Sequence, residues 1–510
     1  MRKHWLFELY SRRTFVALLI ILQVIFLVAT IINTSRQSEL INVALNLLSL
    51  LVALYVISRP DNRPYRLMWT VLLLAFPIFG GLFYLLFSSQ SFVRLLGQRE
   101  AAIDHSARHL LRQDNDVLAS LAQRSPEIVP QARYLARTAG FPLYRNTRVR
   151  YLTPGERMWE VLLAELEKAE KYILLEFFII SPGRMLDSIL NVLRLKAEQG
   201  VEVRLIYDDL GCFLRLPSDF PQRLAALGLK AAVFNPFRPV LSTLQNNRDH
   251  RKIVVIDGKV AFTGGVNIGD EYINADNRPV HWKDAAVMLQ GDAAWGLTMM
   301  FLKMWSLIQN EAVDFQRYQP SDASAAIFDD GFVQPYADSP LDKENVGEHV
   351  YLQIINRAQK YVYINTPYLI LDDVMLEALR LAAKSGVDVR IVTPYHWDKR
   401  LVHITTRSYY RELLAAGVRI YEYTDGFMHS KTFVADDETA TVGTTNLDYR
   451  SLYLHFECGV WLHQSQAVRE IKDDFLQTLK RCQQITLEET ERHALARLGQ
   501  QILRLFAPLL

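Results

Sequence analysis

Cysteine is scarce in this chain of 510 residues, and so is net charge. The three cysteines, Cys212, Cys458 and Cys482, are too few and too scattered for a disulfide framework or a CxxC metal knuckle. The formal net charge is only +2, so composition does not indicate a nucleic-acid partner, and no basic-aromatic stripe indicates one either. The sequence also lacks an HExxH motif and clustered carboxylates, which gives no sign of a metal site.

Apolar residues are concentrated at the N-terminus. Thr14–Ile32 is interrupted only by Gln23 and Thr30 and is long enough to approach the roughly 30 Å of a bilayer core. Two further runs follow at residues 41–57 and 67–87. A secretory signal would have a shorter apolar region and a small-residue cleavage site. The pattern therefore predicts a multi-pass membrane anchor over residues 1–90 with two or three spans.

Positive charge around these runs supports two orientations. Arg2, Lys3, Arg12 and Arg13 precede the first run and favour a cytoplasmic N-terminus. Three full spans would then place the rest of the chain outside. Four arginines follow the third run and instead favour a cytoplasmic position for the chain after it: Arg94, Arg99, Arg108 and Arg112. The side of the membrane on which the large domain lies stays open.

The remainder of the chain is an internal repeat that begins after a polar helical connector at residues 91–135. "AEKYILLEF" from Ala169 resembles "AQKYVYINT" from Ala358, and "AEQGVEVRLI" from Ala197 resembles "AAKSGVDVRIV" from Ala382. Each half alternates apolar strands with helices, which predicts βαβ units and a largely parallel sheet. The fold class is α/β, with one domain over residues 136–320, a joint near residues 321–331, and a second domain over 333–510.

Each half then carries the same cassette, "HRKIVVIDGKVAFTGGVN" from His250 and "HSKTFVADDETATVGTTN" from His429. Residues i and i+2 of a strand share a face, so each histidine points to the same side as its lysine, Lys252 or Lys431. "IVVIDGKVAFTGG" reads as a hairpin with its turn at the Asp-Gly pair. That position predicts that Asp257, and likewise Asp436, fixes the turn and does not touch substrate.

Glycine and asparagine close each cassette at matching offsets: Gly264 and Asn267 in the first, Gly443 and Asn446 in the second. Glycine permits close backbone approach, and N–H and amide groups bind phosphate oxygens, so these residues are predicted to bind substrate. Displacement at a phosphodiester through a covalent intermediate needs a neutral imidazole as nucleophile and a protonated imidazole for the leaving oxygen. Two histidines from two pseudo-symmetric halves can supply both.

The paired HxKxxxxD motifs, with "GGVN" and "GTTN" behind them, resemble the phospholipase D superfamily. Three further stretches narrow the resemblance to bacterial cardiolipin synthases: "PIFGGLFYLLF" from Pro77, "NNRDHRKIVVIDG" from Asn246 and "VGTTNLDYRS" from Val442. The resemblance implies two pseudo-symmetric phospholipase D-like α/β domains preceded by transmembrane helices. It implies transfer between two phosphatidylglycerol molecules in a bacterial inner membrane, giving cardiolipin and glycerol without metal or cofactor. It also places all six motif residues, the aspartates included, at the catalytic centre.

Three acids are weaker candidates. Asp284 in "HWKDAAV" and Glu457 in "HFECGV" trail their cassettes on strand-like stretches, and in the superfamily an acid at this place orients a catalytic imidazole. A surface ion pair is the equal alternative for each. Glu176 lies inside the apolar "LLEFFI" and is better explained as a satisfied structural acid near the pocket.

The final stretch, His493–Leu510, places its leucines and Ile502 on one helical face. This amphipathic helix could lie on the membrane surface or pack against the catalytic domain. A membrane-bound hydrolase or another phosphatidyltransferase of the same superfamily would share the two histidines. A non-catalytic membrane scaffold would not require both cassettes intact. The sequence contains no indication of oligomeric state.

Overall fold

The computed structural model describes residues 25, 28–29, 39–59, 63–76, 84, 91–237, 243–275, 280–320 and 330–509. The apolar run Thr14–Ile32 lies almost wholly outside these residues, as do much of the run at 67–87 and most of the joint at 321–331. Among the helices that the structure describes, none combines the length and the apolarity needed to cross a membrane.

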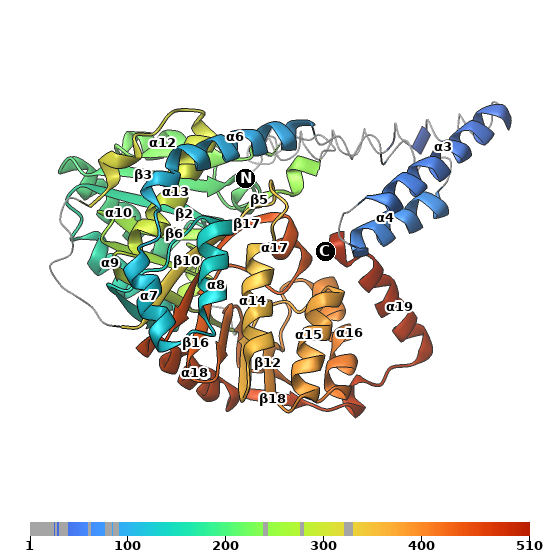
Figure 1. Ribbon diagram of the computed structural model, residues 1–510. Helices are drawn as coiled ribbons and strands as arrows, with labels where there is room; N and C mark the ends of the chain where they lie inside the picture. Colours follow the sequence, from blue (N-terminus) through green and yellow to red (C-terminus); the bar gives the residue numbers. More distant parts are fainter. Residues whose placement is uncertain are drawn as a thin grey trace, which may run out of the picture.

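Two mixed sheets form the body of the molecule (Figure 1). Their strand orders correspond, except that the second sheet continues into one further strand, β18. The first sheet has the order β1-β9-β7-β6-β2-β3-β4, and the second has β10-β17-β16-β15-β11-β12-β13-β18. The first contains β1 (Thr147–Leu152), β2 (Tyr172–Phe177), β3 (Glu202–Asp208), β4 (Lys230–Phe234), β6 (Lys252–Ile256), β7 (Val260–Gly264) and β9 (Ala286–Gly291). The second contains β10 (Phe332–Asp338), β11 (Tyr361–Asn365), β12 (Asp388–Pro394), β13 (Arg419–Tyr423), β15 (Thr432–Ala435), β16 (Thr439–Gly443), β17 (His455–His463) and β18 (Cys482–Ile485).

The prediction of a largely parallel sheet is wrong. Only β2-β3-β4 and β11-β12-β13 run parallel, while the remaining neighbours in both sheets are antiparallel. The βαβ units end when the chain enters the cassette, where β6 and β7 form the expected antiparallel hairpin with Ile256 opposite Val260. A tight turn can join only antiparallel strands, because a parallel neighbour needs a crossover connection.

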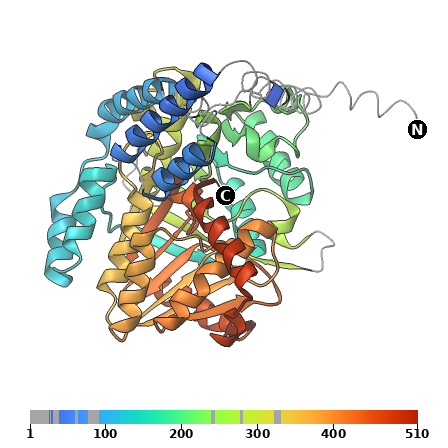
Figure 2. The same ribbon diagram turned by 90° about the vertical axis from the view of Figure 1, so that its right-hand side faces the viewer.

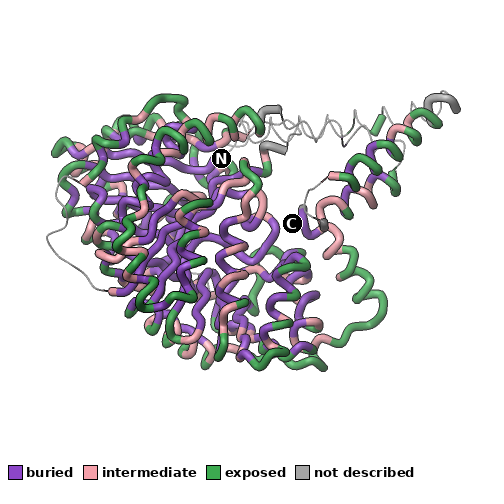
Figure 3. Tube along the Cα trace, in the orientation of Figure 1, coloured by how far each residue is buried: buried purple, intermediate pink, exposed green. Residues whose placement is uncertain are grey.

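A shared apolar core lies between the two sheets. It combines side chains of both sheets with α13 (Ala294–Gln309) and α18 (Gln466–Leu479), which follow β9 and β17 respectively. Figure 3 shows the buried chain concentrated there. The remaining helices of the repeat cover the outer faces: α9 (Gly155–Leu166), α10 (Arg184–Glu198), α12 (Phe220–Ala226), α14 (Val346–Arg357), α15 (Asp373–Lys384) and α16 (Arg400–Ala415). The pseudo-symmetric halves therefore fold against each other on one common interior.

The connector is helical, as its polar pattern predicts. It contains α6 (Ser91–Ala107), α7 (Asn115–Arg124) and α8 (Val129–Tyr134). Ahead of it, α3 (Glu39–Ser58) and α4 (Arg63–Ala75) pack together around a small apolar core, and Phe506 near the C-terminus packs against that core. Figures 1 and 2 both place the C-terminal helix α19 (Ala494–Leu505) beside this hairpin.

Helix α19 shows features of both alternatives offered for it. One side packs against α16, where Arg504 pairs with Glu412 at 2.7 Å and stacks over Tyr409. The other side leaves Leu495, Leu498 and Ile502 exposed. The helix is therefore attached to the second half, while an apolar stripe remains uncovered among the described residues.

Candidate active site

Each catalytic-site histidine follows a short strand, and that strand pairs with a strand of the other half. β5 (Arg248–Asp249), directly before His250, pairs with the start of β17, and the His250 N–H donates to the carbonyl of Phe456 at 2.9 Å. β14 (Gly426–Met428), directly before His429, pairs with β8 (His281–Lys283). The His429 N–H donates to the carbonyl of Lys283 at 2.8 Å. This reciprocal pairing brings the two cassettes to one place between the sheets.

The orienting acids are exchanged between the halves. His250 Nδ1 lies 2.9 and 3.0 Å from the carboxylate oxygens of Glu457, which belongs to the second half. His429 Nδ1 lies 2.6 Å from Asp284 Oδ2, which belongs to the first. Both acids are fully buried, so the surface ion pair offered as the alternative is wrong. An imidazole that donates its Nδ1–H to a carboxylate keeps the Nε2 lone pair free, which is the tautomer a nucleophile needs.

The two acids differ in their surroundings. The Glu457 carboxylate also accepts from the Thr444 hydroxyl, and its partnership with His250 lowers its pKa well below the usual range against the effect of burial. Burial raises the pKa of Asp284 to about 7, although Lys431 opposes the shift. The carboxylate of Glu457 beside His250 therefore stays ionised, whereas the carboxyl of Asp284 beside His429 can exchange a proton near neutral pH.

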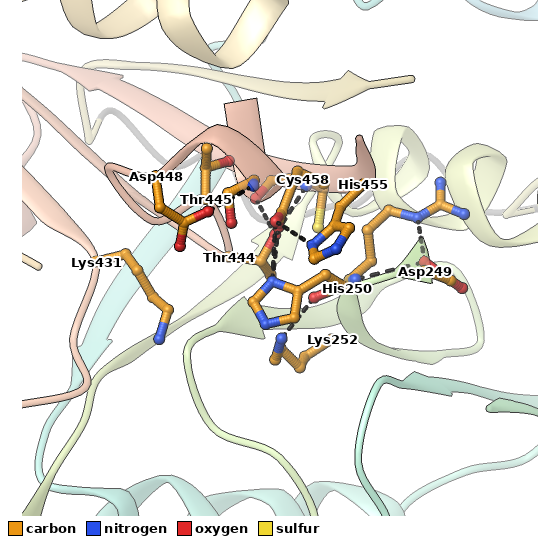
Figure 4. Close-up of polar contacts among 12 residues, drawn as sticks. Asp249, His250, Lys252, Lys431, Thr444, Thr445, Asp448, His455 and Cys458 are labelled. Carbon is orange, nitrogen blue, oxygen red and sulfur yellow. Dashed lines mark hydrogen bonds and ion pairs between the residues drawn. The ribbon is translucent and has the colours of Figure 1, made fainter. Parts of the chain in front are cut away.

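The two lysines converge on the same space from opposite halves. Lys252 and Lys431 are buried, and each Nζ donates at 2.5 Å to the carbonyl of the histidine two residues before it. Figure 4 shows Lys252 directly below the His250 ring and Lys431 to the left of it. Burial lowers the pKa of Lys252 to about 7, and the charge of Lys431 adds to that shift. Burial likewise lowers the pKa of Lys431 to about 8. Two desolvated ammonium groups that lie near enough for one charge to act on the other are suited to bind an anion.

Both imidazoles are also desolvated. Burial lowers the pKa of His250 and of His429 well below the ordinary value, and nearby Lys431 and Lys252 lower that of His429 further. A phosphodiester between the lysines would oppose these shifts, because its negative charge favours the protonated forms. A bound phosphodiester would therefore favour the protonated imidazole that the leaving oxygen needs.

The motif aspartates lie elsewhere. The Asp257 carboxylate accepts from the backbone N–H groups of residues 170–172, each at 2.8 Å, and Asp436 accepts in the same way from residues 359–361. Both aspartates have positive φ, 53° and 57°, at the hairpin turn. They tie the hairpin to the loop before the central strand, as the turn position predicts. Their assignment to the catalytic centre is not supported by these contacts.

The glycines and asparagines do not act as one set. A Cβ on Gly264 would meet Ala285 O at 2.4 Å, and one on Gly443 would meet Cys458 O at 2.5 Å, so both glycines permit close strand contact. Asn267 accepts from the Ile179 N–H and donates to the Tyr272 hydroxyl. Asn446 differs, because its buried Oδ1 has no hydrogen-bond partner among the described residues. Substrate contact by these four residues stays a prediction.

Sequence reasoning missed His455, which lies beside the nucleophile candidate (Figure 4). Its ring centroid is 5.6 Å from that of His250, and its Nδ1 lies 3.8 Å from Glu457 Oε1. His250, His455 and Glu457 form the one group in the described part of the chain that could hold a metal ion. Trp282 occupies the equivalent place in the other half, 5.3 Å from His429. The β5–β17 and β8–β14 pairings create these neighbours, so no local pattern could have found them.

Glu176 is a structural acid, as its apolar context predicts. It is fully buried and pairs with Arg251 at 2.7 Å, and Arg251 also contacts Asp249. Arg251 is the residue between His250 and Lys252, so its side chain leaves on the opposite face of the strand. The cluster supports the strand that carries the first cassette.

We expect the Asp257→Ala substitution to lower the free energy of unfolding by about 2–4 kcal/mol, because three backbone N–H groups lose a charged acceptor. Denaturant unfolding of the purified protein measures this change. Asp219→Ala, at an exposed acid paired only with Arg223, is the matched control and should change stability by less than about 0.5 kcal/mol. An Asp257→Ala protein of unchanged stability that has lost turnover would instead make the aspartate catalytic.

A pair of sheets that brings two buried His-Lys motifs together, with an acid of the other half at each histidine, defines a phospholipase D-like fold and centre. The family described as "Cardiolipin synthase, PLD-like domain" matches residues 162–290 and 351–479, and the family described as "Phospholipase D-nuclease N-terminal" matches residues 44–88. The chain belongs to the cardiolipin synthase family of phospholipase D-like proteins.

Individual relatives agree with this assignment. The chain is 35% identical to a cardiolipin synthase of Geobacillus kaustophilus, over 89% of this chain and 91% of that protein. It is 35% identical to cardiolipin synthase 2 of Bacillus anthracis, over 89% of each. An uncharacterized protein of Streptococcus mutans is 44% identical over 90% of this chain and 99% of its own. The crystal structure of a phosphatidylserine synthase from Haemophilus influenzae shares the fold, with a TM-score of 0.54 at 13% identity over 71% of this chain and 95% of that one.

Proposed function

We propose that this protein is a phosphatidyltransferase that joins two phosphatidylglycerol molecules into cardiolipin with release of glycerol. The observation that carries the proposal is the exchange of acids between the halves, which gives each of two histidines a buried carboxylate at Nδ1. Family membership and the cardiolipin synthases among the relatives support the choice of lipid.

In the first step, His250 Nε2 attacks the phosphorus of one phosphatidylglycerol and forms a P–N bond. The P–O bond to the terminal glycerol breaks, and His429 gives its proton to that oxygen. Glu457 holds the Nδ1–H of His250 and stabilises the positive charge that develops on the ring. Lys252 and Lys431 face the charge on the phosphoryl oxygens.

In the second step, the terminal hydroxyl of another phosphatidylglycerol takes the place of the departed glycerol. His429, now neutral, accepts the hydroxyl proton while the new P–O bond forms and the P–N bond breaks. One phosphodiester is exchanged for another, so no nucleotide-activated donor is required.

The proposal includes attachment to a bacterial inner membrane through a multi-pass segment before residue 90. The apolar runs of that segment and the exposed apolar side chains of α3 and α4, including Leu47, Leu54 and Leu74, support it. A bilayer surface would concentrate and orient phosphatidylglycerol, which lets a lipid hydroxyl compete with water for the phosphohistidine.

The test is a reaction with phosphatidylglycerol as the sole substrate. Purified protein in mixed micelles should form cardiolipin and free glycerol in equal amounts, measured by mass spectrometry and an enzymatic glycerol assay. Phosphatidic acid as the dominant product would indicate a hydrolase. Turnover that requires a cytidine-diphosphate lipid would refute the transfer mechanism.

We expect activity to survive exhaustive chelation within about twofold, because two lysine ammonium groups already stabilise the phosphoryl charge that a divalent cation would otherwise stabilise. Turnover before and after dialysis against a chelator measures this, with metal content followed in parallel. Loss of activity that only added Mg²⁺ or Mn²⁺ restores would contradict it. The candidate metal group among the described residues is His250, His455 and Glu457. An ion bound there would contact Glu457, the carboxylate that orients the nucleophile, so the test bears directly on the proposed mechanism.

A further inference from the structure

Exposed apolar side chains gather on two equivalent loops, one in each half. Leu210 and Leu214 follow β3 and are 40% and 72% exposed. Tyr395, Trp397 and Leu401 follow β12 and are 42%, 57% and 55% exposed. Leaving this much apolar surface in water is unfavourable unless a partner covers it, and aromatic residues of this kind are typical of a membrane interface.

Both loops border the active site. They leave the carboxyl ends of parallel strands, where ligands of open α/β sheets bind. In the first half, Gly211 packs against the backbone of Phe178, whose ring is 4.9 Å from that of His250. In the second half, the Tyr368 hydroxyl donates to Asp398 at 2.5 Å, and the next residue, Leu369, bridges to Leu447 beside Asn446. Each apolar loop therefore lies close to the residues of one cassette.

Charge around the second of these loops suits an anionic surface. Lys399 and Arg400 are exposed between Trp397 and Leu401. The neighbouring Asp398 is already engaged by Tyr368 and by the Lys399 N–H. Cations interspersed with exposed aromatic and aliphatic side chains match the headgroup region of a bilayer that contains anionic lipid.

The N-terminal hairpin lies near the same face. α4 packs against α19 and against the C-terminal turn at residues 507–509, and that turn packs against α17 (Tyr449–Tyr453). α17 comes directly after Asn446, Leu447 and Asp448 of the second cassette. The contacts thus link the hairpin and α19, with their exposed apolar residues, to the element that follows the second cassette.

We propose that the two loops at residues 209–215 and 395–401 form a lipid-docking lip, which inserts into the headgroup region of an anionic phospholipid bilayer and seats the pocket against it. This inference rests on the proposed function for the identity of the lipid. The lip receives the glycerophosphate end of a lipid whose acyl chains stay in the bilayer, so the substrate need not leave the membrane.

The first test separates bilayer substrate from dissolved substrate. A full-length L214Q/W397Q/L401Q variant should lose about tenfold or more in kcat/KM with phosphatidylglycerol vesicles, because three side chains that would enter the interface become polar. With monomeric short-chain phosphatidylglycerol it should stay within about twofold of the unmodified protein, since the lip is not needed to reach a dissolved lipid.

The matched control is L195Q/L381Q. Leu195 and Leu381 are also exposed, 42% and 64%, but they end α10 and α15 at the opposite ends of the strands that carry the lip. This variant should stay within about twofold on both substrates. An unchanged rate of the lip variant on vesicles, or an equal loss on both substrates, would overturn the inference.

The second test does not depend on turnover. Trp397 emission, taken as the difference between the unmodified chain and Trp397→Phe, should be quenched in vesicles by lipids brominated near the headgroup end of the acyl chain. Difference emission that brominated lipids leave unchanged would overturn the lip. An unmodified protein that shows quenching but makes no cardiolipin would refute the proposed function and leave the lip standing.

Discussion

His250→Ala should abolish covalent labelling of the protein by phosphatidylglycerol that carries radioactive phosphate. The substitution removes the only atom proposed to bond to phosphorus, so turnover should fall by roughly 10³-fold or more. Rapid quenching followed by gel autoradiography measures the label, which should be acid-labile and base-stable as a phosphohistidine is. A protein that keeps its label without His250 would have a different nucleophile.

His429→Ala is the partner experiment. It removes the proposed acid but leaves the nucleophile and Glu457 in place, so label should still form, more slowly. If His250→Ala labels and His429→Ala does not, the two roles are inverted. Because His250 is buried and bonded to Glu457, His250→Asn and a thermal unfolding curve for each variant separate lost chemistry from lost folding.

The exchange of acids between the halves predicts a second large loss of activity. Glu457→Gln should lower kcat by about 10²- to 10⁴-fold by removing the charge that supports the His250 ring, as a buried carboxylate does for the base of a serine hydrolase. The formation of label should slow in parallel. The quantity measured is the single-turnover rate of labelling beside the steady-state rate.

Asp284→Asn should instead act on protonation of the leaving group, because Asp284 contacts His429 and not His250. In a phosphatidyl ester of p-nitrophenol, the leaving group is p-nitrophenolate. It departs as an anion and needs no proton. On this substrate the defects of Asp284→Asn and His429→Ala should shrink by about tenfold or more, while the defect of Glu457→Gln should persist. Recovery of Glu457→Gln on the activated ester would show that each acid serves the histidine of its own half.

Local patterns in the sequence were sufficient for the repeat, the cassettes and the β6–β7 hairpin. A strand alternates its faces every residue, and an Asp-Gly turn sets which residues oppose each other, so His250 beside Lys252 and Asp257 at the turn follow from short-range geometry alone. The structural role of Glu176 followed in the same way from an acid placed in an apolar strand.

Long-range pairing decided the rest. The antiparallel part of each sheet, the assignment of Glu457 to His250 and of Asp284 to His429, and the position of His455 all depend on β5 meeting β17 and β14 meeting β8. Those contacts join residues more than 140 positions apart, where no periodicity carries information about a partner. The sequence by itself thus determined that each half carries one histidine and one lysine on the same face of a strand. Only the folding of one half against the other decided which acid serves which base, because each histidine is completed by a strand that its own half does not contain.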